Sequence, residues 1–302
     1  MNTIQAASGK WQGILIALGV DESFLTGKQT PCPGCGGKDR FRYTDYKDDG
    51  NFFCNNCGSG NGFDLLDMTN GWDFKQAAKE VDKIVGNVEV VFKAKKDPRI
   101  LLRKIQKELL SIDGINPVSL YLKKRGLNGS SAIKYHPSLP YYEGGKCLGN
   151  HPAMVCQVKT ASGKPSTYHI TYLNKQGGKA DVENVKKVMP TAESYKGGGI
   201  PLSKPDEAIA ICEGIETALA VQKKTGLAAF AAINAGNLEV FEPPECVDHV
   251  IIFADNDLNF AGQKSAYVLA NRLSLKGFMV DVKIPERVGT DYADVFGEEN
   301  AK

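Results

Sequence analysis

Two sets of side chains in this sequence have the types and the spacing of metal ligands. Cys32 and Cys35 form one Cys-x-x-Cys pair, and Cys54 and Cys57 form a second pair after 18 intervening residues. Four thiolates at this spacing can close a tetrahedral zinc site. Because four protein ligands leave no open position, we expect this Zn²⁺ to be structural.

Three acidic residues follow apolar runs toward the end of the chain. Glu213 follows the run 208–212, and Asp255 and Asp257 follow the run 250–254. Apolar runs that alternate with helical segments are typical of a buried parallel sheet, whose strands end at a common edge. Carboxylates suit hard cations, so we expect these three residues to gather there and bind Mg²⁺ or Mn²⁺. Any one of them alone would more often be a helix cap or a loop residue.

Asp291 and Asp294 form a further acidic pair, after the last predicted strand. They suit a second metal ion or the positioning of metal-bound phosphates. An ordinary helix start explains them equally well.

The composition favours a globular protein of two or three units, because 42% of the 302 residues are hydrophobic. The longest apolar stretch near the start, 14–20, is too short for a signal peptide or a membrane span. We therefore expect a cytoplasmic protein that does not contact membranes. The other four cysteines are scattered along the chain, as reduced thiols would be.

The fold class that we predict is a multi-domain α/β protein with a zinc ribbon, an α+β middle subdomain and a Rossmann-like parallel sheet. Hydrophobic periodicity predicts helices over 4–18, 73–85, 98–111, 117–124, 216–225 and 261–276. It predicts strands over 153–159, 168–173, 208–212, 228–233, 250–254 and 279–284. The first two of these should form a half-exposed antiparallel sheet. We predict a ribbon domain with flanking helices over 1–86 and a basic linker and helix over 87–112. A middle subdomain over 113–205 and a sheet domain over 206–302 follow.

Cations and aromatic rings alternate beside the cysteines, a pattern that suits phosphates and unstacked bases. The candidates for contact with nucleic acid are Lys38, Arg40, Arg42 and Tyr43, with Phe41, Phe52 and Phe53. Phe41 and Phe53 fit the small core of the ribbon equally well. Further along, Lys95, Lys96, Arg103 and Lys104 belong to a strongly basic stretch, and we expect them to bind DNA without sequence preference.

Several motifs together resemble one known family. The run 32–42, CPGCGGKDRFR, with CNNC at 54–57, resembles the zinc ribbon of satellite-phage alpha proteins and related phage and plasmid primases. EGIETA at 213–218, NAGN at 234–237 and DND at 255–257 are similar to the TOPRIM domain of that family. Its middle segment is similar to YLKKRG at 121–126, PAM at 152–154 and HITYL at 169–173.

The resemblance implies a DNA primase that makes short RNA primers on single-stranded DNA from nucleoside triphosphates, with the ribbon reading the template. Glu213, Asp255 and Asp257 would be the catalytic core acids, and Asp291 and Asp294 would match a later acidic motif. The chain has no Gly-x4-Gly-Lys-Ser/Thr loop, so we expect a separate replicative helicase as a partner.

The resemblance also implies that basic residues of the middle segment contact template phosphates or the incoming triphosphate. These residues are Lys123, Lys124, Arg125, His169, Lys179, Lys186 and Lys187. For each lysine alone, a solvated surface role is the simpler interpretation.

Two other functions fit the same motifs. A metal-dependent nuclease would use the same acids to activate water instead of a hydroxyl group. A non-catalytic mediator of recombination or replication would use both domains as scaffolds for binding DNA.

Overall fold

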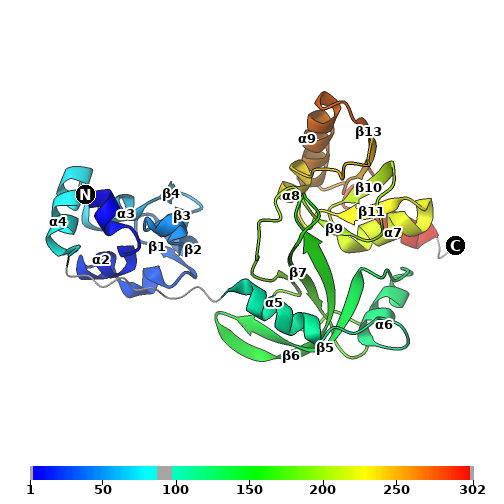
Figure 1. Cartoon of the computed structure of the whole chain (residues 1–302), viewed down its shortest axis with the longest axis horizontal. Helices are drawn as coiled ribbons and strands as arrows, with labels where there is room; N and C mark the ends of the chain where they lie inside the picture. The colour runs from blue at the N-terminus through cyan, green and yellow to red at the C-terminus, as the bar shows by residue number, and fades with distance from the viewer. Residues whose placement is uncertain (1–2, 87–96, 300–302) are drawn as a thin grey trace. The chain divides into compact units, whose positions relative to one another are not determined.

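The chain divides into two compact units, residues 1–95 and 96–302 (Figure 1). The computed structural model describes residues 3–86 and 97–299. Lys95 and Lys96 of the predicted basic linker lie outside the described residues.

Unit 1 is built around an antiparallel sheet in the order β1-β2-β3-β4. Its strands are β1 (Gln29–Cys32), β2 (Gly36–Tyr43), β3 (Phe52–Cys54) and β4 (Gly58–Gly60). Its helices are α1 (Thr3–Ala7), α2 (Trp11–Ala17), α3 (Gly62–Asn70) and α4 (Phe74–Ile84), with 3-10 turns η1 (Glu22–Leu25) and η2 (Tyr46–Asp48).

The helices of unit 1 differ in part from the prediction. The single helix predicted over 4–18 is two helices, because the backbone turns at Gly9 with a φ of 74°. Asp73 caps α4, since its side chain accepts a hydrogen bond from the Gln76 N–H at 2.7 Å. The sequence analysis missed α3, which Asn61 and Asp64 begin with a capping box.

The middle part of unit 2 holds a second antiparallel sheet, in the order β5-β6-β7-β8. Its strands are β5 (Ile133–Glu143), β6 (Lys146–Lys159), β7 (Pro165–Tyr172) and β8 (Lys186–Val188). Its helices are α5 (Pro98–Lys107) and α6 (Pro117–Lys124).

The prediction of a half-exposed middle sheet is wrong, because β7 is buried at every residue after Pro165. One face packs against α5, where Ile105 joins a cluster with Val155 and Ile170. The other face packs against the next layer, where Met154 shares a cluster with Ile215. This sheet therefore lies between two layers.

The C-terminal part of unit 2 is a mostly parallel sheet in the order β13-β12-β10-β11-β9. Its strands are β9 (Ile200–Pro201), which is antiparallel, and the parallel β10 (Ala208–Cys212), β11 (Ala228–Ala231), β12 (His249–Phe253) and β13 (Met279–Lys283). Its helices are α7 (Ile215–Thr225), α8 (Ala235–Glu239), α9 (Ala261–Leu275) and α10 (Tyr292–Glu299).

Helices cover both faces of this parallel sheet (Figure 1). Ile215 and Leu219 of α7 pack on one face, and Leu269 and Leu273 of α9 pack on the other. The predicted multi-domain α/β fold is confirmed. The ends of its parallel strands bring Glu213, Asp255 and Asp257 to one edge of the sheet. No described helix is long and apolar enough to cross a membrane.

Candidate functional site

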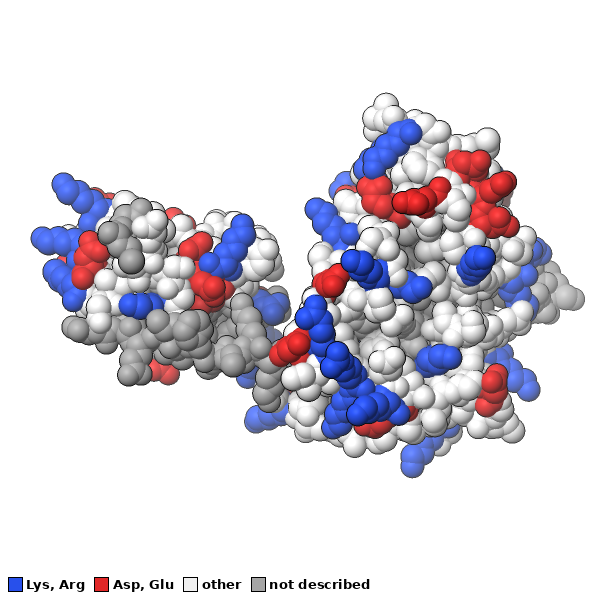
Figure 2. Space-filling view, viewed as in Figure 1, with Lys and Arg blue, Asp and Glu red and all other residues white. Residues whose placement is uncertain are grey.

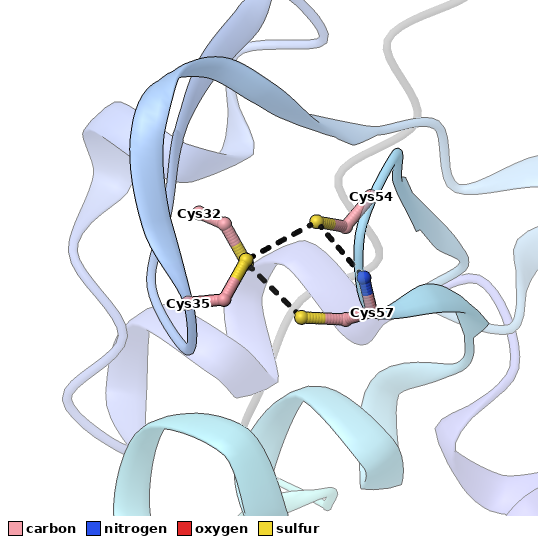
Figure 3. Close-up of side chains that lie close together, drawn as sticks. All are labelled: Cys32, Cys35, Cys54 and Cys57. Carbon is pink, nitrogen blue, oxygen red and sulfur yellow. Dashed lines mark hydrogen bonds between the residues drawn. The ribbon is translucent and has the colours of Figure 1, made fainter.

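The four cysteine side chains of unit 1 come together between two turns of the ribbon (Figure 3). Their four sulfur atoms lie within 4.8 Å of one another. The Sγ atoms of Cys32 and Cys57 are 3.9 Å apart, and those of Cys35 and Cys54 are 3.7 Å apart. A tetrahedral ion with Zn–S bonds of about 2.3 Å separates its sulfurs by about 3.8 Å. The donor set and its spacing therefore fit structural Zn²⁺.

Backbone groups favour the thiolate form at one of these ligands. Burial alone would raise the pKa of Cys54, but the N–H groups of Cys57 and Asn56, with the side chains of Cys32 and Cys35, lower that pKa to about 6. Both N–H groups donate to the Cys54 sulfur at 3.4 Å. Because a metal binds the thiolate, this turn lowers the cost of deprotonation.

The cations predicted on the ribbon surface are exposed, whereas most of the aromatic rings are not. Lys38, Arg40 and Arg42 are exposed on β2. Tyr43 is only 4% exposed and lies in the core of unit 1, so its prediction as a surface contact is wrong. Strand alternation turns residues 41 and 43 inward, because side chains two positions apart share a face.

The phenylalanines of the ribbon divide in the same way. Phe41 and Phe52 are buried and stack with ring centroids 5.2 Å apart. Phe53 is 49% exposed. Of the predicted rings, Phe53 alone remains open to a base in the described part of the ribbon.

The three core acids of unit 2 follow two strands that pair directly. β10 and β12 are parallel neighbours with Cys212 opposite Phe253. Glu213 follows the end of β10, and Asp255 and Asp257 follow the end of β12. All three therefore lie along the carboxyl edge of the sheet, as predicted from the strand pattern.

A glycine allows the start of α9 to approach the two aspartates. A Cβ atom at Gly262 would lie 2.6 Å from the Asp255 backbone oxygen and 3.1 Å from the Asp257 Oδ2 atom. The Gly262 N–H donates to the same Oδ2 atom at 2.9 Å. Asp257 is thus held in place, and any larger side chain at position 262 would displace this loop.

Mutual repulsion and burial dominate the electrostatics of this edge. Burial is the main cause that raises the pKa of Asp255, followed by the charges of Asp291, Glu213, Asp257 and Asp294, and together they bring this pKa to about 7. Burial also raises the pKa of Glu213, with Asp257 as the next cause, while the Ala235 N–H and Lys186 oppose the shift. Four carboxylates thus act on Asp255, and a bound cation would relieve this repulsion.

The acids do not converge on a single point. Among the described residues, the cysteine group is the one cluster of three or more potential ligands within 4.8 Å. The three acids thus follow strands that meet at one edge, as predicted, but their ligand atoms do not form a single cluster.

One observation fits the acidic edge to a divalent cation. The Oδ1 atom of Asp255 is buried and has no hydrogen-bond partner. A buried carboxylate oxygen is costly unless a cation or a donor compensates it. Hard oxygen ligands of this kind are suited to Mg²⁺ or Mn²⁺.

Asp291 and Asp294 cap α10. The Oδ1 atom of Asp291 accepts hydrogen bonds from the Ala293 and Asp294 N–H groups at 2.6 and 3.0 Å. The Oδ2 atom of Asp294 accepts from the Asp291 N–H at 3.2 Å. The helix-start interpretation therefore holds, although both charges still act on Asp255.

Lys186 and Lys187 have different surroundings. Lys186 Nζ donates to the Glu216 Oε2 atom at 2.9 Å. Lys187 Nζ instead donates to Glu143 at 3.0 Å and lies 3.9 Å from the centre of the Tyr141 ring. Neighbouring residues of a strand point to opposite faces, so these two lysines do not share a site.

His169 is not a surface cation. Its side chain is 7% exposed, and burial followed by the charge of Lys186 lowers its pKa to about 4. It is therefore neutral near pH 7 and cannot attract phosphate by charge, which corrects its prediction as a phosphate contact. Its Nδ1 atom has no hydrogen-bond partner.

The other predicted basic residues of the middle part are exposed. Lys123, Lys124 and Arg125 lie at the end of α6, where Lys124 donates to the Gln176 carbonyl oxygen at 2.8 Å. The Arg125 guanidinium lies 4.9 Å from the centre of the Tyr121 ring. Lys179 is exposed after β7. These positions leave their roles as contacts to nucleic acid open as predictions.

Lys and Arg side chains gather over α5 (Figure 2). Its exposed cations are Arg99, Arg103, Lys104 and Lys107. We call these four residues the basic stripe. It includes Arg103 and Lys104, the described part of the predicted DNA-binding stretch.

The sequence analysis missed several polar residues around the acidic edge. Glu216 was part of a motif but received no role, although it is 7% exposed and bonded to Lys186 and Tyr121. Asn237 is equally buried and joins the 197–198 backbone to the end of β11. The available signal was a charged or amide residue among the apolar positions of a helix.

Comparison with family models assigns three segments of the chain. Residues 27–63 match a zinc-binding domain of primase-helicase, and residues 208–302 match a Toprim domain. The chain has a primase-type zinc ribbon and a Toprim domain. Residues 96–201, between the ribbon and the Toprim domain, match a domain of unknown function, DUF7146. The resemblance to primases is thereby confirmed for the ribbon and the Toprim domain.

Solved primase structures are similar to the chain at low identity. The zinc-binding and RNA polymerase domains of the Aquifex aeolicus primase share 15% identity, with 100% of this chain and 84% of that chain covered and a TM-score of 0.47. A DNA primase domain from Pseudomonas aeruginosa shares 16% identity, with 67% of this chain and 74% of that chain covered and a TM-score of 0.44. The primase fragment of the bacteriophage T7 primase-helicase protein shares 15% identity, with 90% of this chain and 96% of that chain covered and a TM-score of 0.39.

Proposed function

We propose that the protein is a DNA primase, which joins nucleoside triphosphates into short RNA primers on a single-stranded DNA template. The observation that carries the proposal is the acidic edge of the Toprim domain, with its unpaired Asp255 oxygen, in a chain that also holds a primase-type ribbon. In this proposal the ribbon reads the template, and a separate replicative helicase supplies the unwound strand.

Glu213, Asp255 and Asp257 would hold the divalent cations. Such cations neutralise the triphosphate and lower the pKa of the primer 3′-hydroxyl group. The contribution of the chain itself is positioning. The rigid ends of β10 and β12 set the separation of the acids, and the Gly262 N–H holds Asp257 in place.

The remaining groups of the edge would tune this site. Asp291 and Asp294 add negative charge from the start of α10, which strengthens the attraction for cations. Their carboxylates already accept backbone hydrogen bonds, so we propose a supporting role for them and a ligand role for the three core acids.

The test is primer synthesis by zinc-loaded protein with Mg²⁺ or Mn²⁺, four ribonucleoside triphosphates and a library of short single-stranded templates. We expect wild type to form short oligonucleotides and Asp255→Asn to form none. Glu245→Gln, which changes an exposed acid elsewhere in the Toprim domain, is the matched control and should retain full activity.

Two outcomes would overturn the proposal. Release of labelled fragments from DNA without nucleoside triphosphates, lost in Asp255→Asn, would support the nuclease. Binding of DNA without any product from the template library, unchanged in Asp255→Asn, would support the non-catalytic mediator.

A further inference from the structure

A buried carboxylate in α7 connects the Toprim layer to the middle sheet. Glu216 is 7% exposed, and its Oε1 atom accepts a hydrogen bond from the Tyr121 hydroxyl at 2.9 Å. Its Oε2 atom accepts from Lys186 Nζ at the same distance. Burial alone would raise the pKa of Glu216, but Lys186 and Tyr121 hold that pKa at about 2. Glu216 is thus a permanent anion with both oxygens bonded.

The lysine of this pair remains open to a ligand. The Lys186 side chain is 44% exposed, compared with 9% for that of Glu216. An ammonium group has three N–H donors, and Glu216 is the one hydrogen-bond partner of Lys186 in the described part of the chain. Two donors are therefore available, and their direction is set by a bond to a rigid, buried group.

The same lysine lies within the electrostatic field of the acidic edge. Its partner Glu216 lies in the first turn of α7, three residues after Glu213, and the bond to Lys186 Nζ is 2.9 Å long. A triphosphate bound through cations at this edge retains negative charge, which a lysine beside the edge can neutralise. Lys187, the next residue, is engaged by Glu143 and has no such position.

We propose that Glu216 is a positioning residue, which holds the Lys186 ammonium group beside the acidic edge so that it binds the triphosphate of the incoming nucleotide. This inference rests on the proposed function. It assigns to Glu216 a role beyond the joining of two layers. If Glu216 were only a structural link, its substitution would change the affinity for triphosphate equally with and without Lys186.

The test is a double-mutant cycle on the full chain with Glu216→Gln and Lys186→Met. Two quantities are measured for each variant: the KM for ATP in primer synthesis, and the Kd of ATP with Mg²⁺ in the absence of template. We expect Lys186→Met to raise both by about 10-fold or more, the size of a lost charge-assisted hydrogen bond. Glu216→Gln should raise both by about 5-fold, and by less than about 2-fold when Lys186 is already Met.

Matched variants separate positioning from stability. Lys276→Met, at a lysine that pairs with Glu242 at 2.8 Å and belongs to neither site, should leave the KM and the Kd unchanged. Tyr121→Phe removes the other partner of Glu216, so it should lower the thermal midpoint without a change in KM. If Glu216→Gln does not fold, Lys186→Arg replaces it in the test, since arginine can still bond to Glu216 and should restore most of the affinity lost in Lys186→Met.

Equal effects of Glu216→Gln with and without Lys186 would overturn the inference, as would an unchanged Kd in Lys186→Met. These results are distinct from failure of the proposed function. If wild type makes no primer but the two substitutions are coupled in ATP binding, the role of Glu216 stands and the primase activity is wrong. If wild type makes primers but the two substitutions are not coupled, the primase activity stands and the role of Glu216 is wrong.

Discussion

The cysteine site and the acidic edge differ in how the fold assembles them. The four sulfurs come from two tight turns and lie within 4.8 Å of one another, at the spacing that a single ion requires. The acids follow strands that meet only in the folded sheet, where burial first and repulsion by the other carboxylates second raise the pKa of Asp255 to about 7. The cysteine site therefore stabilises its unit, whereas the acidic edge costs stability in favour of function.

Removal of zinc gives the largest expected effect and tests the first half of this contrast. Chelation should unfold unit 1, because metal binding contributes about 10–16 kcal/mol to folding in small zinc domains. Limited proteolysis should then cleave within residues 1–86 and leave a fragment of unit 2 intact. Cys147→Ser, at an exposed cysteine outside the site, should keep the wild-type pattern. Equal resistance of both units after chelation would contradict the account.

Asp255→Asn tests the second half of the contrast. Primer synthesis should fall by about 10³-fold or more, because the residue acts on charge that develops during transfer. The thermal midpoint of unit 2 should stay the same or rise, since the variant removes a charge that burial and the neighbouring carboxylates disfavour. A loss of stability in parallel with activity would assign Asp255 to the fold instead.

The buried histidine of β7 predicts a pH dependence that belongs to unit 2. The pKa of His169 is about 4 in the folded chain, with burial as the main cause, against about 6.5 in an unfolded chain. The unfolded chain therefore binds a proton first, and stability is lost as the pH falls from about 6.5 to about 4.

His169→Asn should remove this contribution, which is about 2–3 kcal/mol. The measurement is the free energy of unfolding at a series of pH values. A variant whose stability falls with acid as steeply as that of wild type would contradict the assignment.

The smallest expected effect concerns the basic stripe on α5, which lies outside both sites. Arg103→Gln together with Lys104→Gln should weaken binding of single-stranded DNA and reduce the slope of log affinity against log salt by about 1.4. Lys276→Gln is the control, because that lysine is already paired with Glu242 at 2.8 Å. Unchanged slopes in both variants would exclude the stripe as a DNA contact.

Patterns that depend on short stretches of sequence predicted the site well. The Cys-x-x-Cys pairs placed all four zinc ligands, because two turns determine their geometry. The rule that parallel strands end at a common edge placed Glu213 beside Asp255 and Asp257, once β10 and β12 proved to be neighbours.

Features that depend on packing between layers escaped prediction. Tyr43 alternates with exposed arginines, and nothing local shows which face of β2 is buried. His169 appeared half-exposed because the helix α5 and the Toprim layer, which cover the two faces of its sheet, are distant in sequence. The bond between Glu216 and Lys186 joins residues 30 positions apart on different layers. Only the folded chain brings these groups together.

The central claim is that the acids of the sheet edge bind divalent cations, and direct titration of Mn²⁺ into zinc-loaded protein tests it. Electron paramagnetic resonance of free Mn²⁺ would follow binding to wild type, Asp255→Asn and the control Glu245→Gln. We predict that Asp255→Asn weakens Mn²⁺ binding by about 10-fold or more and that the control does not. Equal binding by all three proteins would contradict the account.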